Sequence, residues 1–97
     1  MEDLVSIYFI SNTENTHIKI GRSNNLKERL GTLQVANSAK LQVEYVIEGM
    51  KPSFEGYIHE IVKRFNVSGE WFEHGALLHL LNHPWFNEHM IPVRKIT

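Results

Sequence analysis

Two short stretches of alternating apolar residues, separated by a polar segment, constrain the N-terminal part of this chain most strongly. In residues 5–10 every second side chain is strongly apolar, and the same alternation returns in residues 17–21. A period of two is typical of β-strands, and the intervening polar segment is rich in turn-forming residues. The pattern predicts a β-hairpin in which Tyr8 and Lys19 point to the face opposite the apolar one.

The rest of the chain mixes helical and strand periodicity. Leucines spaced by four and three residues predict a helix that begins at an N-cap on Ser23 or Asn24 and ends near Val35. Residues 41–47 alternate and predict a third strand, which should return to the same sheet. Further along we expect helices over residues 54–65 and 76–83, the second stopped by Pro84, a short extended segment at 69–72 and a terminal strand at 91–93.

Composition bounds the class of protein. With 97 residues, 42% hydrophobic and 22% charged, the chain suits one small α/β domain, residues 1–97, with a core over about residues 5–83. The absence of Cys excludes a disulfide framework, a thiolate zinc site and a cysteine nucleophile. No apolar run approaches the roughly 20 residues of a membrane span, and the acidic start is unlike a signal peptide. We therefore expect no membrane association and a soluble, intracellular protein.

The charge distribution is uneven. The net charge of −1 argues against binding of nucleic acid through bulk positive charge. Residues 17–31, however, hold four basic residues against one acid, whereas residues 1–16 and 41–60 each carry a net charge of −3. Such a local basic cluster suits a single bound anionic group, and a solvated helix flank is the alternative interpretation.

Five polar residues are candidates for one site. Tyr8 and Lys19 share a sheet face, and Arg29 lies at the edge of the apolar stripe of its helix. Glu55 and His59 lie one turn apart at the edge of the apolar stripe of the second long helix. Cations for a phosphate, an oxygen group to activate water and a carboxylate for a hard metal ion are the groups that metal-assisted phosphodiester hydrolysis requires.

The order of these residues resembles the GIY-YIG nuclease superfamily. Ser6-Ile7-Tyr8 and Lys19-Ile20-Gly21 look like the two strand motifs, and Gly69-Glu70-Trp71-Phe72 resembles a segment of the phage and viral branch, in which KIG replaces YIG. The resemblance covers residues 6–81. It implies a small three-stranded antiparallel sheet flanked by helices, and an endonuclease that hydrolyses DNA phosphodiester bonds with one Mg²⁺ or Mn²⁺.

The resemblance also implies a role for each matching position. Tyr8 would be the general base, with a pKa that Lys19 or Arg29 lowers below the value of about 10 of a free tyrosine. Lys19 and Arg29 would stabilise the scissile phosphate, and Glu55 would bind the metal. His59 and Arg22 would be auxiliary residues.

Some matches depart from the family pattern or stay open. Ser6 replaces the glycine of GIY and Lys19 replaces the second tyrosine, which leaves open a catalytically decayed module that binds nucleic acid or a protein partner. The late asparagine of the family has only Asn82 as a candidate. RNA is not distinguished from DNA, because its hydrolysis needs the same groups. The small size leaves a homodimer open.

Other residues have simpler interpretations. Trp71 and Phe72 are expected to close the core. Glu70, between Gly69 and Trp71, is expected to form a structural salt bridge, with an auxiliary role at the site as the alternative. His79 and His83 have the i, i+4 spacing of zinc ligands, but the chain offers little as a third ligand, so we expect no zinc.

Overall fold

The computed structural model describes residues 3–12, 17–36, 40–88 and 93–95. Within these residues the strands form one six-stranded antiparallel sheet in the order β4-β5-β2-β1-β3-β6. Their bounds are β1 Val5–Asn12, β2 His17–Ser23, β3 Leu41–Met50, β4 Asn66–Ser68, β5 Trp71–Glu73 and β6 Val93–Lys95. The predicted α/β class is confirmed.

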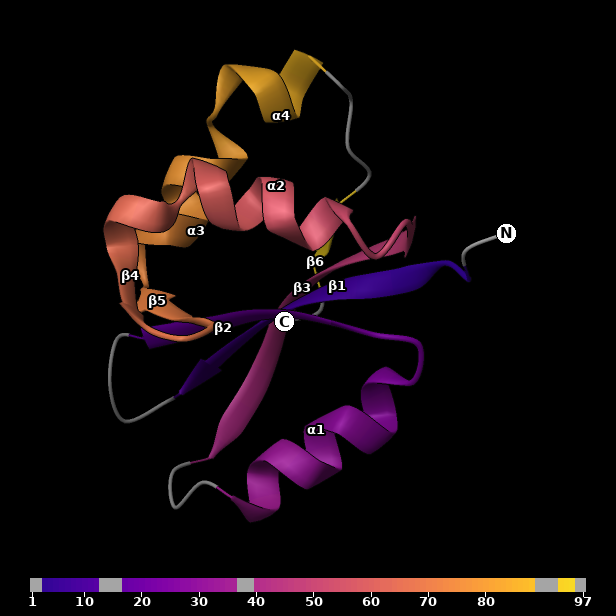
Figure 1. The fold of residues 1–97 in the computed structure, drawn as a ribbon. Helices are drawn as coiled ribbons and strands as arrows, with labels where there is room; N and C mark the ends of the chain where they lie inside the picture. The colour runs from indigo at the N-terminus through magenta and orange to yellow at the C-terminus, as the bar shows by residue number, and fades with distance from the viewer. Residues whose placement is uncertain (1–2, 13–16, 37–39, 89–92, 96–97) are drawn as a thin grey trace.

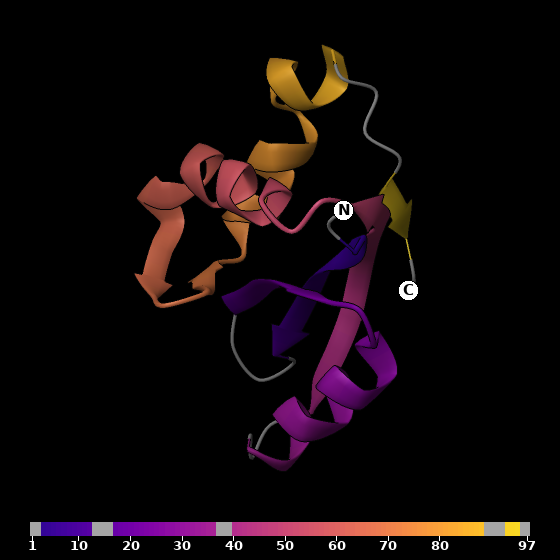
Figure 2. The ribbon, with the colours of Figure 1, turned by 45° about the vertical axis from the view of Figure 1, so that its right-hand side comes forward.

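The helices cover both faces of the sheet (Figure 1). Their bounds are α1 Leu26–Val35, α2 Phe54–Ile61, α3 Gly75–Leu81 and α4 Pro84–Glu88, and a 3₁₀ turn, Lys63–Phe65, follows α2. Helix α1 lies on one face, and α2, α3 and α4 lie on the other. Figure 2 shows the β4–β5 hairpin close to α2 and α3, at the edge of the sheet opposite to β6.

Each face of the sheet has its own apolar cluster. The larger one lies under α2, α3 and α4 and includes Ile7, Phe9, Ile18 and Ile20 from the hairpin. The smaller cluster contains Tyr8 from the same hairpin and packs against the leucines of α1. The predicted alternation of faces in the hairpin is therefore confirmed.

Several element boundaries differ from the sequence-based expectation. The sheet has six strands instead of three, because the short strands β4, β5 and β6 extend a central trio of β2, β1 and β3. The N-cap of α1 is Asn25, whose side chain accepts from the backbone N–H of Glu28 at 3.2 Å, while Ser23 accepts from the N–H of Asn25. Pro84 ends one helix as predicted but also begins α4, since a helix tolerates proline in its first turn.

The C-terminal strand and the end of α2 also differ from the sequence-based expectation. The terminal strand is β6, Val93–Lys95, and residues 91–92 of the predicted strand lie outside the described residues. The helix predicted over 54–65 ends at Ile61 and continues as the 3₁₀ turn. None of the helices in the described ranges is long and apolar enough to cross a membrane.

Candidate functional site

Tyr8 lies directly across Gly21 on the α1 face of the sheet. The register of β1 and β2 pairs the two residues, and the Tyr8 side chain is 2% exposed. A Cβ atom at position 21 would collide with the hydroxyl and ring of Tyr8. The glycine of the KIG motif therefore leaves the space in which the tyrosine ring lies.

Two hydrogen bonds hold α2 beside β2. The guanidinium of Arg22 donates to the carbonyl of Pro52 at 2.7 Å, just before the helix begins. The Nε2–H of His59 donates to the carbonyl of Ile20 at 2.8 Å. Because these bonds fix the start and the last turn of α2, they also fix the position of Glu55 in its first turn.

Glu55 has a buried carboxylate oxygen without a partner. The side chain as a whole is half-buried, but its Oε2 atom is inaccessible to solvent and has no hydrogen bond to any of the residues that the structure describes. A buried acceptor without a partner costs about 1–3 kcal/mol. Such a cost is characteristic of functional sites, where a ligand supplies the missing contact.

Glu70 connects the candidate residues. Its backbone carbonyl accepts from the N–H of Ile20 at 3.0 Å, which fixes it beside β2. Its carboxylate lies 3.1 Å from the ammonium of Lys19 and within hydrogen-bonding contact of the Glu55 carboxyl. The Lys19 ammonium also lies 5.6 Å from the ring centroid of Trp71. Lys19 is thus engaged by two neighbours and has a side chain that is only 14% exposed.

The electrostatics of the site favour protonated acids. Burial raises the pKa of Glu55, the neighbouring Glu70 raises it further, and the charges of His59 and Arg22 oppose this. Burial also raises the pKa of Tyr8, to about 12, with Glu70 and Glu55 adding to the shift. The charge of Arg29 lowers the pKa of Tyr8, as expected, but burial and the carboxylates outweigh it. The expectation of a lowered pKa is therefore wrong for the protein alone.

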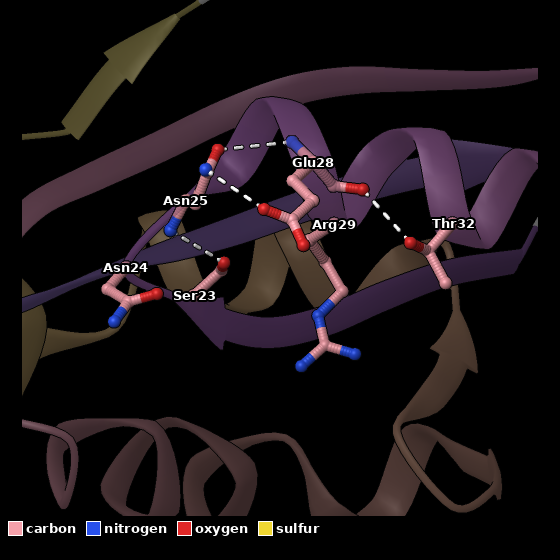
Figure 3. A pocket seen from close by; sticks show the side chains of 6 residues that line it. All are labelled: Ser23, Asn24, Asn25, Glu28, Arg29 and Thr32. Atoms are coloured by element: carbon pink, nitrogen blue, oxygen red, sulfur yellow. Dashed lines mark hydrogen bonds between the residues drawn. The ribbon is translucent and has the colours of Figure 1, made fainter.

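Arg29 lies at the exposed side of the site. It lines a hollow of about 280 Å³ at the start of α1, together with Ser23, Asn24, Asn25, Glu28 and Thr32. In Figure 3 its guanidinium projects away from α1, while Asn25 and Glu28 bond to each other. No hydrogen bond or ion pair within the described residues holds the guanidinium, so its donors are available to an anion.

The structure brings most of the candidates together. Lys19 and Glu55 both contact Glu70, and the charges of Glu70, Arg29 and Glu55 are close enough to shift the pKa of Tyr8. The sequence led us to favour a structural salt bridge for Glu70 over an auxiliary role, and it did not reveal the contact with Glu55. The signal available in the sequence was its place in the Gly69–Phe72 segment, directly after a glycine.

Four other residues singled out in the sequence lie elsewhere or have structural roles. The amide of Asn82 donates to the carbonyl of Leu78 at 3.0 Å and caps α3. Phe72 is 2% exposed and belongs to the larger apolar cluster, as predicted. The Nδ1 atoms of His79 and His83 pair with Arg64 and with the backbone N–H of Trp85.

The donor set suits a hard divalent cation. Among the described residues no group of three or more His, Cys, Asp or Glu side chains could hold a metal ion. Mg²⁺, however, is usually held by one or two carboxylates, with water and substrate phosphates as the other ligands. The partnerless oxygen of Glu55 matches that requirement.

In comparison with known proteins, no curated protein and no solved structure matches the chain, whereas a family model does. The T5orf172 domain matches residues 5–88, which include every strand and helix of the site. The chain therefore belongs to the T5orf172 domain family, a phage-associated family related to GIY-YIG and HNH-like nucleases.

Proposed function

We propose that this domain is a metal-dependent endonuclease that hydrolyses phosphodiester bonds of DNA. The observation that carries the proposal is the buried oxygen of Glu55, which has no partner among the described residues and lies beside Glu70. The charges of Glu55 and Arg29 both act on Tyr8. A purely structural glutamate on a helix surface would leave both carboxylate oxygens in water or in hydrogen bonds. The family relationship supports the same class of activity.

The reaction needs a water molecule, a proton acceptor and stabilisation of a charged phosphate. Water attacks phosphorus while the bond between phosphorus and the 3′ oxygen breaks, and the 3′ oxygen takes a proton from solvent. The products carry a 5′-phosphate and a 3′-hydroxyl. Tyr8 first releases its phenolic proton to solvent, and its phenolate then accepts the proton of the attacking water, directly or through a neighbouring group. Arg29 contacts the phosphate oxygens with its planar donors and stabilises the charge that develops on them.

Glu55 would hold the Mg²⁺ or Mn²⁺ ion. When bound, the ion would supply positive charge for the departing oxygen and would offset the carboxylate charges, which add to the effect of burial on the pKa of Tyr8. His59 and Arg22 do not contact substrate in this proposal. They position Glu55 through their bonds to Ile20 and to Pro52.

A second candidate is a non-catalytic module that binds nucleic acid or a protein. The ion pair between Lys19 and Glu70 favours it, because the ammonium that would meet a phosphate is already engaged. The pKa of about 12 at Tyr8 points the same way, since the phenol keeps its proton at neutral pH. If the domain is such a module, its affinity for nucleic acid or for a protein partner should not change with a divalent metal or with Tyr8→Phe.

Cleavage of plasmid, single-stranded and branched DNA, and of RNA, in Mg²⁺ tests the proposal. The wild-type protein should cut DNA, and Glu55→Gln should lose activity. Glu60→Gln is the matched control, because Glu60 is on the same helix but has a side chain that is 70% exposed. Arg29→Lys should lower the rate at least about 100-fold, as loss of a charge-stabilising donor does. Binding without cleavage, unaffected by Tyr8→Phe, would favour the non-catalytic module.

A further inference from the structure

We infer that Glu70 is a second carboxylate ligand of the metal site at Glu55. This inference rests on the proposed function and extends it from one protein ligand to two. The family resemblance assigns the metal to Glu55 alone, whereas the structure places a second carboxylate, from a different element, in contact with it.

The backbone fixes Glu70 at this place. Gly69, with a φ of 54°, turns the chain between β4 and β5, and the side-chain amide of Asn66 donates to the Gly69 carbonyl at 2.8 Å. The N–H of Ile20 then donates to the carbonyl of Glu70 at 3.0 Å. Since Ile20 also accepts from His59 of α2, its peptide groups align Glu70 and the helix that carries Glu55 on the same stretch of β2.

The charges near this pair are incompletely balanced. Lys19 lies 3.1 Å from Glu70, but Glu55 has one buried oxygen with no hydrogen bond. Two carboxylates in contact repel each other unless a proton or a cation lies between them. A divalent cation bound by both would satisfy the buried oxygen of Glu55 and remove the repulsion.

The chemistry of the pair selects the kind of ion. Both donors are carboxylate oxygens, which suit hard cations such as Mg²⁺ and Mn²⁺ better than they suit soft ones. The side chain of Glu70 is 40% exposed, so a cation with water ligands can reach it from solvent.

Calorimetric titration of Mn²⁺ into the purified domain tests the inference without measuring activity. Glu70→Gln should weaken Mn²⁺ binding at least about tenfold, as changes at metal sites commonly do. Glu73→Gln is the matched control, because Glu73 is exposed on the adjoining strand β5 and should bind Mn²⁺ as the wild type does. Glu55→Gln should weaken binding at least as much as Glu70→Gln. Thermal melts establish that each variant is folded.

Glu70→Asp separates direct ligation from the effect of a nearby charge. Aspartate keeps the charge but has a shorter reach, so a direct ligand predicts weakened binding. Wild-type affinity in Glu70→Gln or in Glu70→Asp, together with loss in Glu55→Gln, would overturn the role of Glu70 and leave the proposed nuclease intact. If the wild type binds no Mn²⁺, the inference fails outright. The DNA cleavage assay then decides separately whether the proposed function also fails.

Discussion

Replacement of Gly21 by alanine tests whether the KIG glycine exists to accommodate Tyr8. A Cβ atom at this position would overlap the hydroxyl and the ring of Tyr8, so the ring must leave its place across β2. Tyr8 is 2% exposed and packs in the apolar cluster under α1, which leaves it little room to move. Overpacking of this kind costs typically 1–3 kcal/mol.

For a domain of this size, a loss of about 2 kcal/mol lowers Tm by about 8–16 °C. Thermal melts followed by circular dichroism measure that loss. Gly31→Ala is the control, because nothing lies within 4 Å of a Cβ there and the residue is inside α1. Alanine at this helical position should stabilise the domain by about 0.5–1 kcal/mol.

A double-mutant cycle assigns the loss to Tyr8. Leucine at position 8 fills the core but has no ring atoms or hydroxyl to reach Gly21. In the Tyr8→Leu background, Gly21→Ala should therefore cost little, which gives a coupling energy of about 1–3 kcal/mol. Full stability of Gly21→Ala, or an equal loss in both backgrounds, would refute the steric explanation.

Three further changes test the electrostatics and anchoring of the site. Because burial raises the pKa of Glu55 in the folded protein, its ionisation destabilises the fold as pH rises. Glu55→Gln should then raise stability at pH 7, because the neutral amide carries no charge into the buried site, with the gain vanishing on acidification. The raised pKa of Tyr8, about 12, contributes stability below pH 10 that is lost between pH 10 and 12, so Tyr8→Phe should flatten alkaline unfolding in that range. His59→Ala removes the bond to Ile20 and should cost about 1–2 kcal/mol in denaturant melts. If His59→Ala is as stable as the wild type, contacts other than the bond to Ile20 hold α2 in place.

Local sequence patterns predicted the parts of the site that lie within single elements. Alternation placed Tyr8 and Lys19 on one face of the hairpin, because successive side chains of a strand point in opposite directions. Helical spacing predicted that Glu55 is less exposed than Glu60, as observed.

Contacts between distant segments could not be predicted in this way. The pairing of β2 with β5 brings Glu70 to Glu55, and neither residue carries a periodic signal of that contact. The short strand β4 is exposed throughout and therefore has no apolar alternation to reveal it. The pKa of Tyr8 depends on burial and on two carboxylates from other elements, so the sequence suggested the wrong direction.

A crystal of the domain soaked in Mn²⁺ tests the central claim most directly, because manganese scatters anomalously and its position can be mapped without assumptions. The site described predicts one anomalous peak within about 2–2.3 Å of a Glu55 carboxylate oxygen, on the side that faces Tyr8. Manganese bound elsewhere, for example at His79 and His83, with nothing at Glu55, would contradict the assignment of a hydrolytic metal site.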